Sequence, residues 1–218
     1  MSKKKNLIIC VILALIAFIY TLLVKYVDVQ AIGPNGSSVG FAGINKAISG
    51  LLGTHMSLYK LTEYLGYLAL LFAFNYALIG ILQLFKRKSL LKIDKEIIIL
   101  GVFYIIVIGL YVFFEKVIIN YRPVLIDGVL EASYPSSHTL LALCICGSSL
   151  IVNKYLFKDK KSAKYGNVIS ILLMISILLG RLISGVHWFS DIVGGILISV
   201  ALLKIFKTVL ECINEKKA

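Results

Sequence analysis

The chain has 218 residues, of which 59% are hydrophobic and only 16% are charged. This composition is too apolar for a soluble domain and predicts an integral membrane protein with several spans. The formal charge of +12 would suit a nucleic-acid-binding protein. Membrane proteins, however, carry a similar excess of Lys and Arg in their cytoplasmic loops.

The N-terminal part begins with three lysines at residues 3–5, followed by an uncharged run over residues 7–24. That run is long for the core of a signal peptide, so it predicts a membrane span over about residues 7–27. Residues 25–60 are rich in Gly and Ser and become mildly amphipathic between residues 41 and 52. We expect a loop there, with a helix that lies at the membrane interface.

Two further apolar runs predict spans over about residues 60–85 and 96–114. The short basic segment 86–95 joins them. Residues 115–134 are polar, and Pro123 within them prevents one continuous helix. They form the second large loop in this prediction.

The last three spans are expected at about residues 138–156, 165–183 and 187–206. With the others they make an all-α integral membrane protein of six transmembrane helices, in which residues 1–218 form a single membrane-embedded domain. Arg181 and Asp191 fall near the connection between the last two spans. An ionisable group at membrane depth is costly unless it is paired or lines a wet cavity, so such residues indicate a functional site.

The basic residues predict the orientation of the six spans. Of the 23 Lys and Arg residues, 17 lie in the N-terminal tail, in the loops around residues 86–95 and 154–164, and at the C-terminal end from Lys204 onward. Cytoplasmic segments are enriched in Lys and Arg, so we expect cytoplasmic termini in the plasma membrane. Topology then explains the basic excess, and no nucleic-acid partner is expected.

The residues that could bind a substrate or take part in catalysis should lie together on the opposite, extracytoplasmic face. Arginine presents a planar fork of donors that suits phosphate oxygens, and a helix N-terminus also favours a phosphate. We expect no metal and no cofactor, because the set holds one acidic residue and no metal-ligand spacing. The set consists of Arg122, Ser136, Ser137, His138, Arg181, His187 and Asp191.

His187 and Asp191 are four residues apart. If the chain is helical from about residue 187, both side chains lie on one face, and the carboxylate can fix the imidazole tautomer. The free ring nitrogen would then serve as a nucleophile or a base. The alternative is that Ser190 or Asp191 only caps the helix.

At these positions the chain resembles the type 2 phosphatidic acid phosphatase superfamily, whose six-helix members dephosphorylate lipid phosphates and diphosphates without metal. The family pattern is Lys, six residues, Arg-Pro; then Pro-Ser-Gly-His; then Ser-Arg, five residues, His, three residues, Asp. Here it is matched by Arg122-Pro123, by Pro135, Ser136 and His138, and by Arg181, His187 and Asp191.

The resemblance implies a role for each matched residue. His187 would be the nucleophile that forms a phosphohistidine, Asp191 would orient it, and His138 would protonate the leaving oxygen. The phosphate oxygens would be held by Arg122, Arg181, the Ser136 side chain and the Ser137 backbone N–H, in an oxyanion-type clamp.

Three positions depart from the family pattern. Glu115 occupies the position of the family lysine, and Lys116 lies one residue too close to Arg122, so Lys116 reaches the phosphate only if the helix end is distorted. Ser137 replaces the family glycine, and Gly180 replaces the serine before Arg181.

The preferred function is therefore a metal-independent membrane phosphatase that acts on lipid phosphates or diphosphates at the extracytoplasmic face. A polyprenyl diphosphate phosphatase, a non-catalytic protein of the same fold that binds or moves a lipid, and a lipid phosphotransferase are the alternatives. The sequence does not identify the hydrocarbon chain of the substrate or the oligomeric state of the protein.

Overall fold

The computed structural model describes residues 3–157 and 159–215, and these residues form an all-helical protein without β-strands. Two short 3₁₀ turns, η1 (Pro34–Gly36) and η2 (Leu90–Lys92), lie in connections. The α-helices are α1 (Lys3–Tyr26), α2 (Ala42–Leu52), α3 (Met56–Arg87), α4 (Lys95–Lys116), α5 (Ser137–Leu156), α6 (Lys160–Ile183) and α7 (Phe189–Glu215).

All of these helices except α2 are long and apolar enough to cross a membrane, which gives six candidate spans in the described part of the chain. Large apolar side chains cover their outer faces, such as Phe18 on α1 and Phe85 on α3, which are 61% and 74% exposed. An outward-facing apolar surface of this extent suits a lipid environment. The predicted all-α membrane fold with six spans is confirmed.

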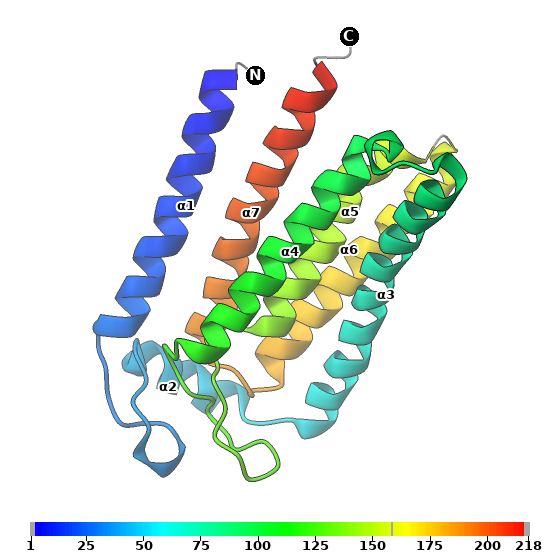
Figure 1. Cartoon of the computed structure of the whole chain (residues 1–218). Coiled ribbons are helices and arrows are strands. Elements are labelled where there is room, and N and C mark those ends of the chain that lie inside the picture. Colours follow the sequence, from blue (N-terminus) through cyan, green and yellow to red (C-terminus); the bar gives the residue numbers. More distant parts are fainter. Residues whose placement is uncertain (1–2, 158, 216–218) are drawn as a thin grey trace.

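The two described ends of the chain lie at one end of the bundle, together with the α3–α4 and α5–α6 connections (Figure 1). The long connections α1–α2 and α4–α5 lie at the opposite end. Helix α2 crosses that end instead of running along the bundle. The basic segments 86–95 and 154–164 are thus at the same end as the N-terminal lysines, as the charge pattern predicts.

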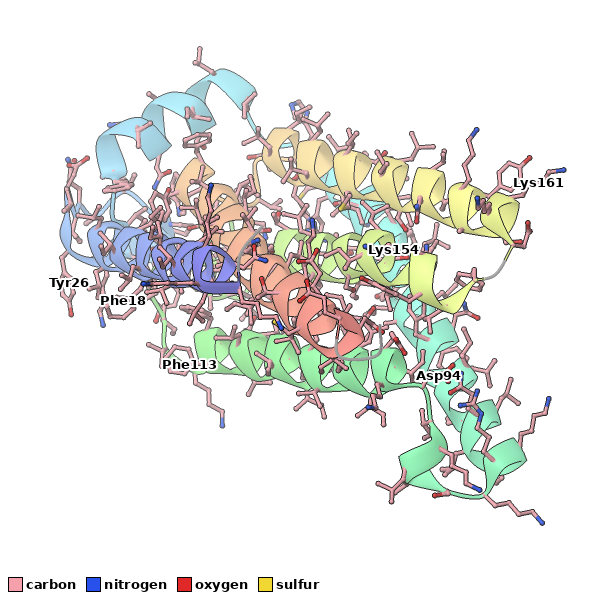
Figure 2. The ribbon with its side chains drawn as sticks, turned by 90° about the horizontal axis from the view of Figure 1, so that it is seen from above. Phe18, Tyr26, Asp94, Phe113, Lys154 and Lys161 are labelled. Atoms are coloured by element: carbon pink, nitrogen blue, oxygen red, sulfur yellow. The ribbon has the colours of Figure 1, made fainter. Side chains whose placement is uncertain are left out.

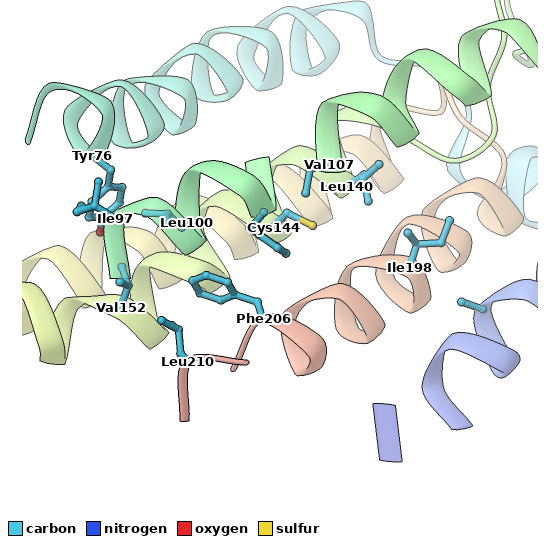
Figure 3. Packing of buried hydrophobic residues seen from close by; sticks show 12 residues of the cluster. Tyr76, Ile97, Leu100, Val107, Leu140, Cys144, Val152, Ile198, Phe206 and Leu210 are labelled. Carbon is cyan, nitrogen blue, oxygen red and sulfur yellow. The ribbon is translucent and has the colours of Figure 1, made fainter. Parts of the chain in front are cut away.

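Helix α5 is the central element and packs against α3, α4, α6 and α7. The main core lies where α4, α5 and α7 meet (Figure 3). There the rings of Phe103 on α4 and Phe206 on α7 have centroids 4.7 Å apart. Leu140 lies in the first turn of α5 beside Val107 of α4, and Val152 lies near the other end of α5; both are fully buried (Figure 3). Packing of α5 against α4 and α7 holds these helices together, and the chemistry-bearing residues lie at the end of the bundle where α5 and α7 begin.

Candidate active site

His187 lies in the connection between α6 and α7 and is buried. Its Nδ1 atom is 3.1 Å from the backbone oxygen of Ser133 and 3.1 Å from the Ser133 hydroxyl. A carbonyl oxygen can only accept, so Nδ1 carries the proton and donates it. The lone pair is therefore on Nε2, which lies 3.3 Å from Nη1 of Arg122. This is the tautomer that a nucleophilic imidazole needs.

A tight turn produces the position of His187. Gly185 has φ +67°, a left-handed conformation that L side chains rarely adopt. A Cβ atom at this glycine would also overlap the backbone oxygen of Gly53. Glycine thus lets the chain reverse after α6 and present the imidazole toward the 120–134 segment.

Asp191 lies in the first turn of α7 and accepts hydrogen bonds from four groups, one of them the hydroxyl of the neighbouring Ser190 at 3.4 Å. Its Oδ2 atom accepts from the Trp188 backbone N–H at 2.9 Å and from the Ser133 hydroxyl, and its Oδ1 atom accepts from the Asn120 amide at 3.2 Å. The bond to Trp188 is the side-chain half of a helix-capping arrangement. The Asp191 carboxylate thus caps the start of α7, which was the alternative interpretation of the sequence. It also accepts a hydrogen bond from the Ser133 hydroxyl.

The relation between His187 and Asp191 differs from the expected helical pair. Helix α7 begins at Phe189, so His187 precedes it. The Nδ1–Oδ2 distance is 3.9 Å, which is long for a direct hydrogen bond. Ser133 lies between them, donating to Asp191 and lying beside Nδ1. Sequence reasoning missed Ser133 and Asn120, because no spacing rule connects them with residues more than fifty positions away.

Arg122 is buried in the α4–α5 connection. An isolated bridge between Tyr121 and Ala132 holds this segment, and the Arg122 backbone N–H donates to the Glu131 oxygen at 3.1 Å. The Arg122 Nε atom forms an ion pair of 3.0 Å with the Glu131 carboxylate. One edge of the guanidinium is therefore paired, while Nη1 faces His187.

Arg181 is the largest fully buried side chain. Its guanidinium lies 4.7 Å from the centre of the Tyr59 ring on α3, a cation–π contact. Among the described residues, none of its three side-chain nitrogen atoms makes a hydrogen bond of good geometry, and the Tyr59 hydroxyl and the Glu63 carboxylate are the groups that attract its charge. A buried cation without hydrogen bonds is costly, so this arrangement favours an anionic ligand.

Gly180 precedes Arg181, where the resembled family has serine. A Cβ atom here would overlap the Thr62 side chain of α3. Close packing of α6 on α3 therefore accounts for the missing side chain. It also brings Tyr59 of α3 against Arg181.

Ser136, Ser137 and His138 form the start of α5, as predicted. The Ser136 backbone N–H donates to the Asp191 backbone oxygen at 3.1 Å, which ties the beginnings of α5 and α7 together. The Ser136 hydroxyl is buried and accepts from Thr139 at 3.0 Å. The helix N-terminus directs its backbone N–H groups toward this region, which favours an anion.

His138 packs against Gly66 of α3, where a Cβ atom would lie 3.0 Å from the imidazole Cδ2. Its Nδ1 atom is buried and has no partner among the described residues. Both Arg122 and Arg181 interact electrostatically with His138 and with His187. The fold therefore brings the two predicted histidines and the two predicted arginines into one cluster.

The environment of His187 keeps its imidazole neutral. Burial, followed by the positive charges of Arg122 and Arg181, holds the pKa of His187 well below its ordinary value of 6.5. Since the folded-state pKa is lowered, the ring stays neutral as pH falls through 6.5. The neutral imidazole, which a nucleophilic role would require, is thus the form present at physiological pH.

A narrow cavity of about 10 Å³ borders His187, Ser133 and Ser137, close to the room that one water molecule needs. Glu115, at the end of α4, also lines it. Lys116 does not line this cavity; it is exposed, and none of the ion pairs among residues 3–157 and 159–215 includes it. The α4 helix remains regular through Lys116, so the distortion that Lys116 would need is absent.

The donor set is not of the metal-binding kind. Within the described residues, no group of three or more His, Cys, Asp or Glu side chains lies close enough to hold a metal ion. The positively charged groups around His187 are the guanidinium groups of Arg122 and Arg181, a kind of group that binds phosphate oxygens directly.

An apolar recess of about 260 Å³ lies between α1 and α4 beside the site. Phe18 of α1 and Phe113 of α4 line it and face the same side of the bundle (Figure 2). The next residue, Phe114, lines both this recess and the cavity at His187. The reactive cluster therefore adjoins an apolar surface that can accept a hydrocarbon chain.

Comparisons with known proteins bear on the family and on the fold. The family model of the PAP2 superfamily matches residues 97–213. The chain is 33% identical over 91 residues to lipid phosphate phosphatase delta of Arabidopsis thaliana, an alignment that spans 41% of the chain and 22% of that relative. A solved structure, the transmembrane PAP2-type phosphatidylglycerolphosphate phosphatase of Bacillus subtilis, superposes with a TM-score of 0.60 at 21% identity. It covers 94% of the chain and 96% of its own length, and thus shows the same fold.

Proposed function

The chain belongs to the PAP2 superfamily, and from this membership and the site geometry we propose that it is a membrane phosphatase of lipid phosphates or diphosphates. One observation carries the proposal. His187 has its Nδ1 proton bound to Ser133 and its Nε2 atom beside Arg122, within reach of a second histidine and a second arginine. A nucleophile, an acid and two anion-binding groups are the parts that metal-independent phosphoryl transfer requires.

The reaction has two steps. In the first, Nε2 of His187 attacks the phosphorus atom and the bond from phosphorus to the leaving oxygen breaks, while His138 donates a proton to that oxygen. The product alcohol or phosphate leaves, and a phosphohistidine remains. In the second, water attacks the phosphorus atom, His138 takes a proton from that water, and the P–N bond breaks to restore His187.

Arg122 and Arg181 hold the phosphate oxygens, on which negative charge develops, and the Ser137 N–H at the start of α5 supports them. The buried Ser136 hydroxyl is occupied by Thr139, so its part in the clamp depends on a rearrangement of that bond. Asp191 acts through Ser133, which keeps the imidazole of His187 in one tautomer.

The histidine pair favours catalysis over a purely lipid-binding role. A binding pocket gains little from an acid placed opposite a nucleophile. The missing serine at Gly180 is a packing feature against Thr62, so it is no sign of a degenerate site. The apolar recess at Phe113 and Phe114 supports a substrate with a long hydrocarbon chain.

We expect the purified protein to release inorganic phosphate from a panel of lipid phosphates and diphosphates, and excess EDTA to leave the rate nearly unchanged. Arginines bind the phosphate where a metallophosphatase would use carboxylate and histidine ligands around a metal. The measurement is phosphate release in detergent micelles with and without chelator. A rate that EDTA abolishes and added magnesium or zinc restores would contradict this mechanism. Failure to hydrolyse any member of the panel would contradict the function.

The site is proposed to face the extracytoplasmic side of the plasma membrane, with both termini in the cytoplasm. The bias of Lys and Arg toward the end that holds the termini supports this orientation. A cysteine introduced at Asp127, in a variant without the four native cysteines, should react with an impermeant maleimide on intact cells. A cysteine introduced at Lys88 should react only after lysis, and the reverse result would show the opposite orientation.

A further inference from the structure

An open recess of about 520 Å³ lies between the end of α5 and the first turns of α6. The α5–α6 connection is at the end of the bundle that holds both described chain ends (Figure 1). The α6–α7 connection, which contains His187, is at the opposite end. This α5–α6 recess is therefore separate from the candidate active site.

Three lysines surround the α5–α6 recess, namely Lys154 on α5 and Lys160 and Lys164 on α6. All three are exposed, and no ion pair in the described part of the chain includes any of them. The Lys154 ammonium group lies 4.7 Å from the centre of the Tyr155 ring, a contact that does not neutralise its charge. The neighbouring carboxylate, Asp159, accepts two backbone N–H groups in the first turn of α6 at 3.0 Å each. The recess thus has a concentrated positive charge.

The face that α6 presents to the recess changes in character along the helix. Its lining positions are 160, 163, 164, 167, 168 and 171, which is the spacing of a single helical face. The lysines come first, Asn167 follows, and the apolar Val168 and Ile171, which are 46% and 41% exposed, come last. At 1.5 Å per residue this face is about 16 Å long. A phospholipid has the same order, with a charged head group followed by hydrocarbon.

Asn167 forms a polar floor between the charged and the apolar parts of the recess. Its Oδ1 atom accepts from the side-chain amide of Asn153 on α5 at 2.8 Å. Asn153 is buried and in turn accepts from the Tyr76 hydroxyl of α3. A connected network of this kind holds its side chains in place. Because the Asn167 oxygen is used by Asn153, the groups that Asn167 can offer to a ligand are its two N–H donors, which suit an anion.

We infer that the α5–α6 recess binds the head group of an anionic phospholipid. The three lysines and the Asn167 amide contact the phosphate oxygens, and the acyl chains lie along Val168 and Ile171. Basic pockets between membrane spans bind head groups of this kind. The apolar continuation of the recess favours a lipid over a soluble anion, because a soluble anion gains nothing from it. The inference does not depend on the proposed hydrolysis, which takes place at the other end of the bundle.

Binding of one lipid molecule to the purified protein in a nonionic detergent can be measured by native mass spectrometry. The two probes are phosphatidylglycerol and phosphatidylcholine with the same oleoyl chains, so that they differ only in the head group. We expect the wild-type protein to bind phosphatidylglycerol about tenfold or more tightly than phosphatidylcholine, because each lysine close to an anionic lipid contributes about fivefold. Inorganic phosphate in large excess should not displace the bound lipid.

Replacing the lysines at positions 154, 160 and 164 together by glutamine should reduce this ratio to near one. Unchanged affinity for phosphatidylcholine would show that the variant keeps its fold. Asn167→Asp retains the oxygen that accepts from Asn153 and adds a negative charge. It should therefore weaken binding of phosphatidylglycerol by about fivefold and leave that of phosphatidylcholine unchanged.

The matched control replaces Lys86, Lys88 and Lys92 by glutamine. These exposed lysines lie in or next to the α3–α4 connection at the same end of the bundle, and they do not line the recess. The control removes the same charge and should leave the ratio unchanged.

Three results would overturn the inference: a wild-type ratio near one, an equal loss in the control variant, or displacement of the lipid by inorganic phosphate. The second would show that the total charge of this end attracts the lipid, and the third that the recess holds a soluble anion. None of these results bears on hydrolysis at His187, so the proposed function is tested separately.

Discussion

Replacing His187 by alanine should lower turnover of every substrate by about 10⁴-fold or more, the scale on which loss of a nucleophile acts. The structure gives the reason: the Nδ1 atom is held by Ser133 and Nε2 is directed at Arg122. No second imidazole has this geometry, because Nδ1 of His138 has no partner among the described residues. The measurement is phosphate release together with trapping of acid-labile, alkali-stable label from a ³²P-labelled lipid phosphate.

The wild-type protein should acquire that label, and His187→Ala should not. Protonation of His187 should not limit labelling between pH ~8 and pH ~6, because burial and the charges of Arg122 and Arg181 hold the pKa of His187 well below 6.5 and its ring stays neutral over this range. His55→Ala is the control, since His55 is an exposed histidine that contacts the Leu52 backbone oxygen. A His187→Ala protein that still acquires label would place the nucleophile elsewhere.

Replacing His138 by alanine should have an effect that depends on the leaving group. Loss of a general acid costs about 10²–10⁴-fold when the leaving oxygen needs a proton, so an alkyl phosphate should suffer a loss of this size. A nitrophenolate ion leaves without a proton, so nitrophenyl phosphate should lose roughly tenfold or less. The measurement is kcat/KM of the wild-type and His138→Ala proteins on both substrates.

His138→Ala should still form the phosphohistidine from nitrophenyl phosphate, because His187 and its contacts with Ser133 and Arg122 are unchanged. This labelling serves as the control for folding. Equal losses on the two substrates would show that His138 binds or positions the phosphate instead of donating a proton. Absence of label would show that it is needed for nucleophilic attack itself.

Much of the fold follows from the sequence alone, because the lipid bilayer allows uncharged segments of this length few conformations other than a helix. Long uncharged runs must form helices in a lipid bilayer, where every backbone N–H and C=O has to be bonded within the segment. Hence the six spans could be located to within a few residues of most helix ends, and the basic loops could be grouped at one end. The motif residues Arg122, His138, Arg181, His187 and Asp191 were also recognisable from sequence, because their types and spacing suit phosphate chemistry.

The orientation of His187 could not be predicted, because it depends on contacts between distant parts of the chain. The four-residue spacing suggested a direct pair with Asp191 along a helix, but α7 begins only at Phe189. Ser133, from the α4–α5 connection, lies between the two side chains. Likewise, nothing near Gly180 in sequence indicates that Thr62 of α3 occupies the space of a side chain there.

Which residue at the end of α4 lines the cavity at His187 was also decided by the tertiary structure. From sequence, Lys116 was a candidate for the phosphate site and Glu115 was only a departure from the family pattern. Because α4 stays regular to its end, successive residues point about 100° apart, and packing against the 132–137 segment turns Glu115 toward the cavity of His187. Sequence determined which residues lie near the end of α4, whereas the rotation of that helix against its neighbours determined which of them lines the cavity at His187.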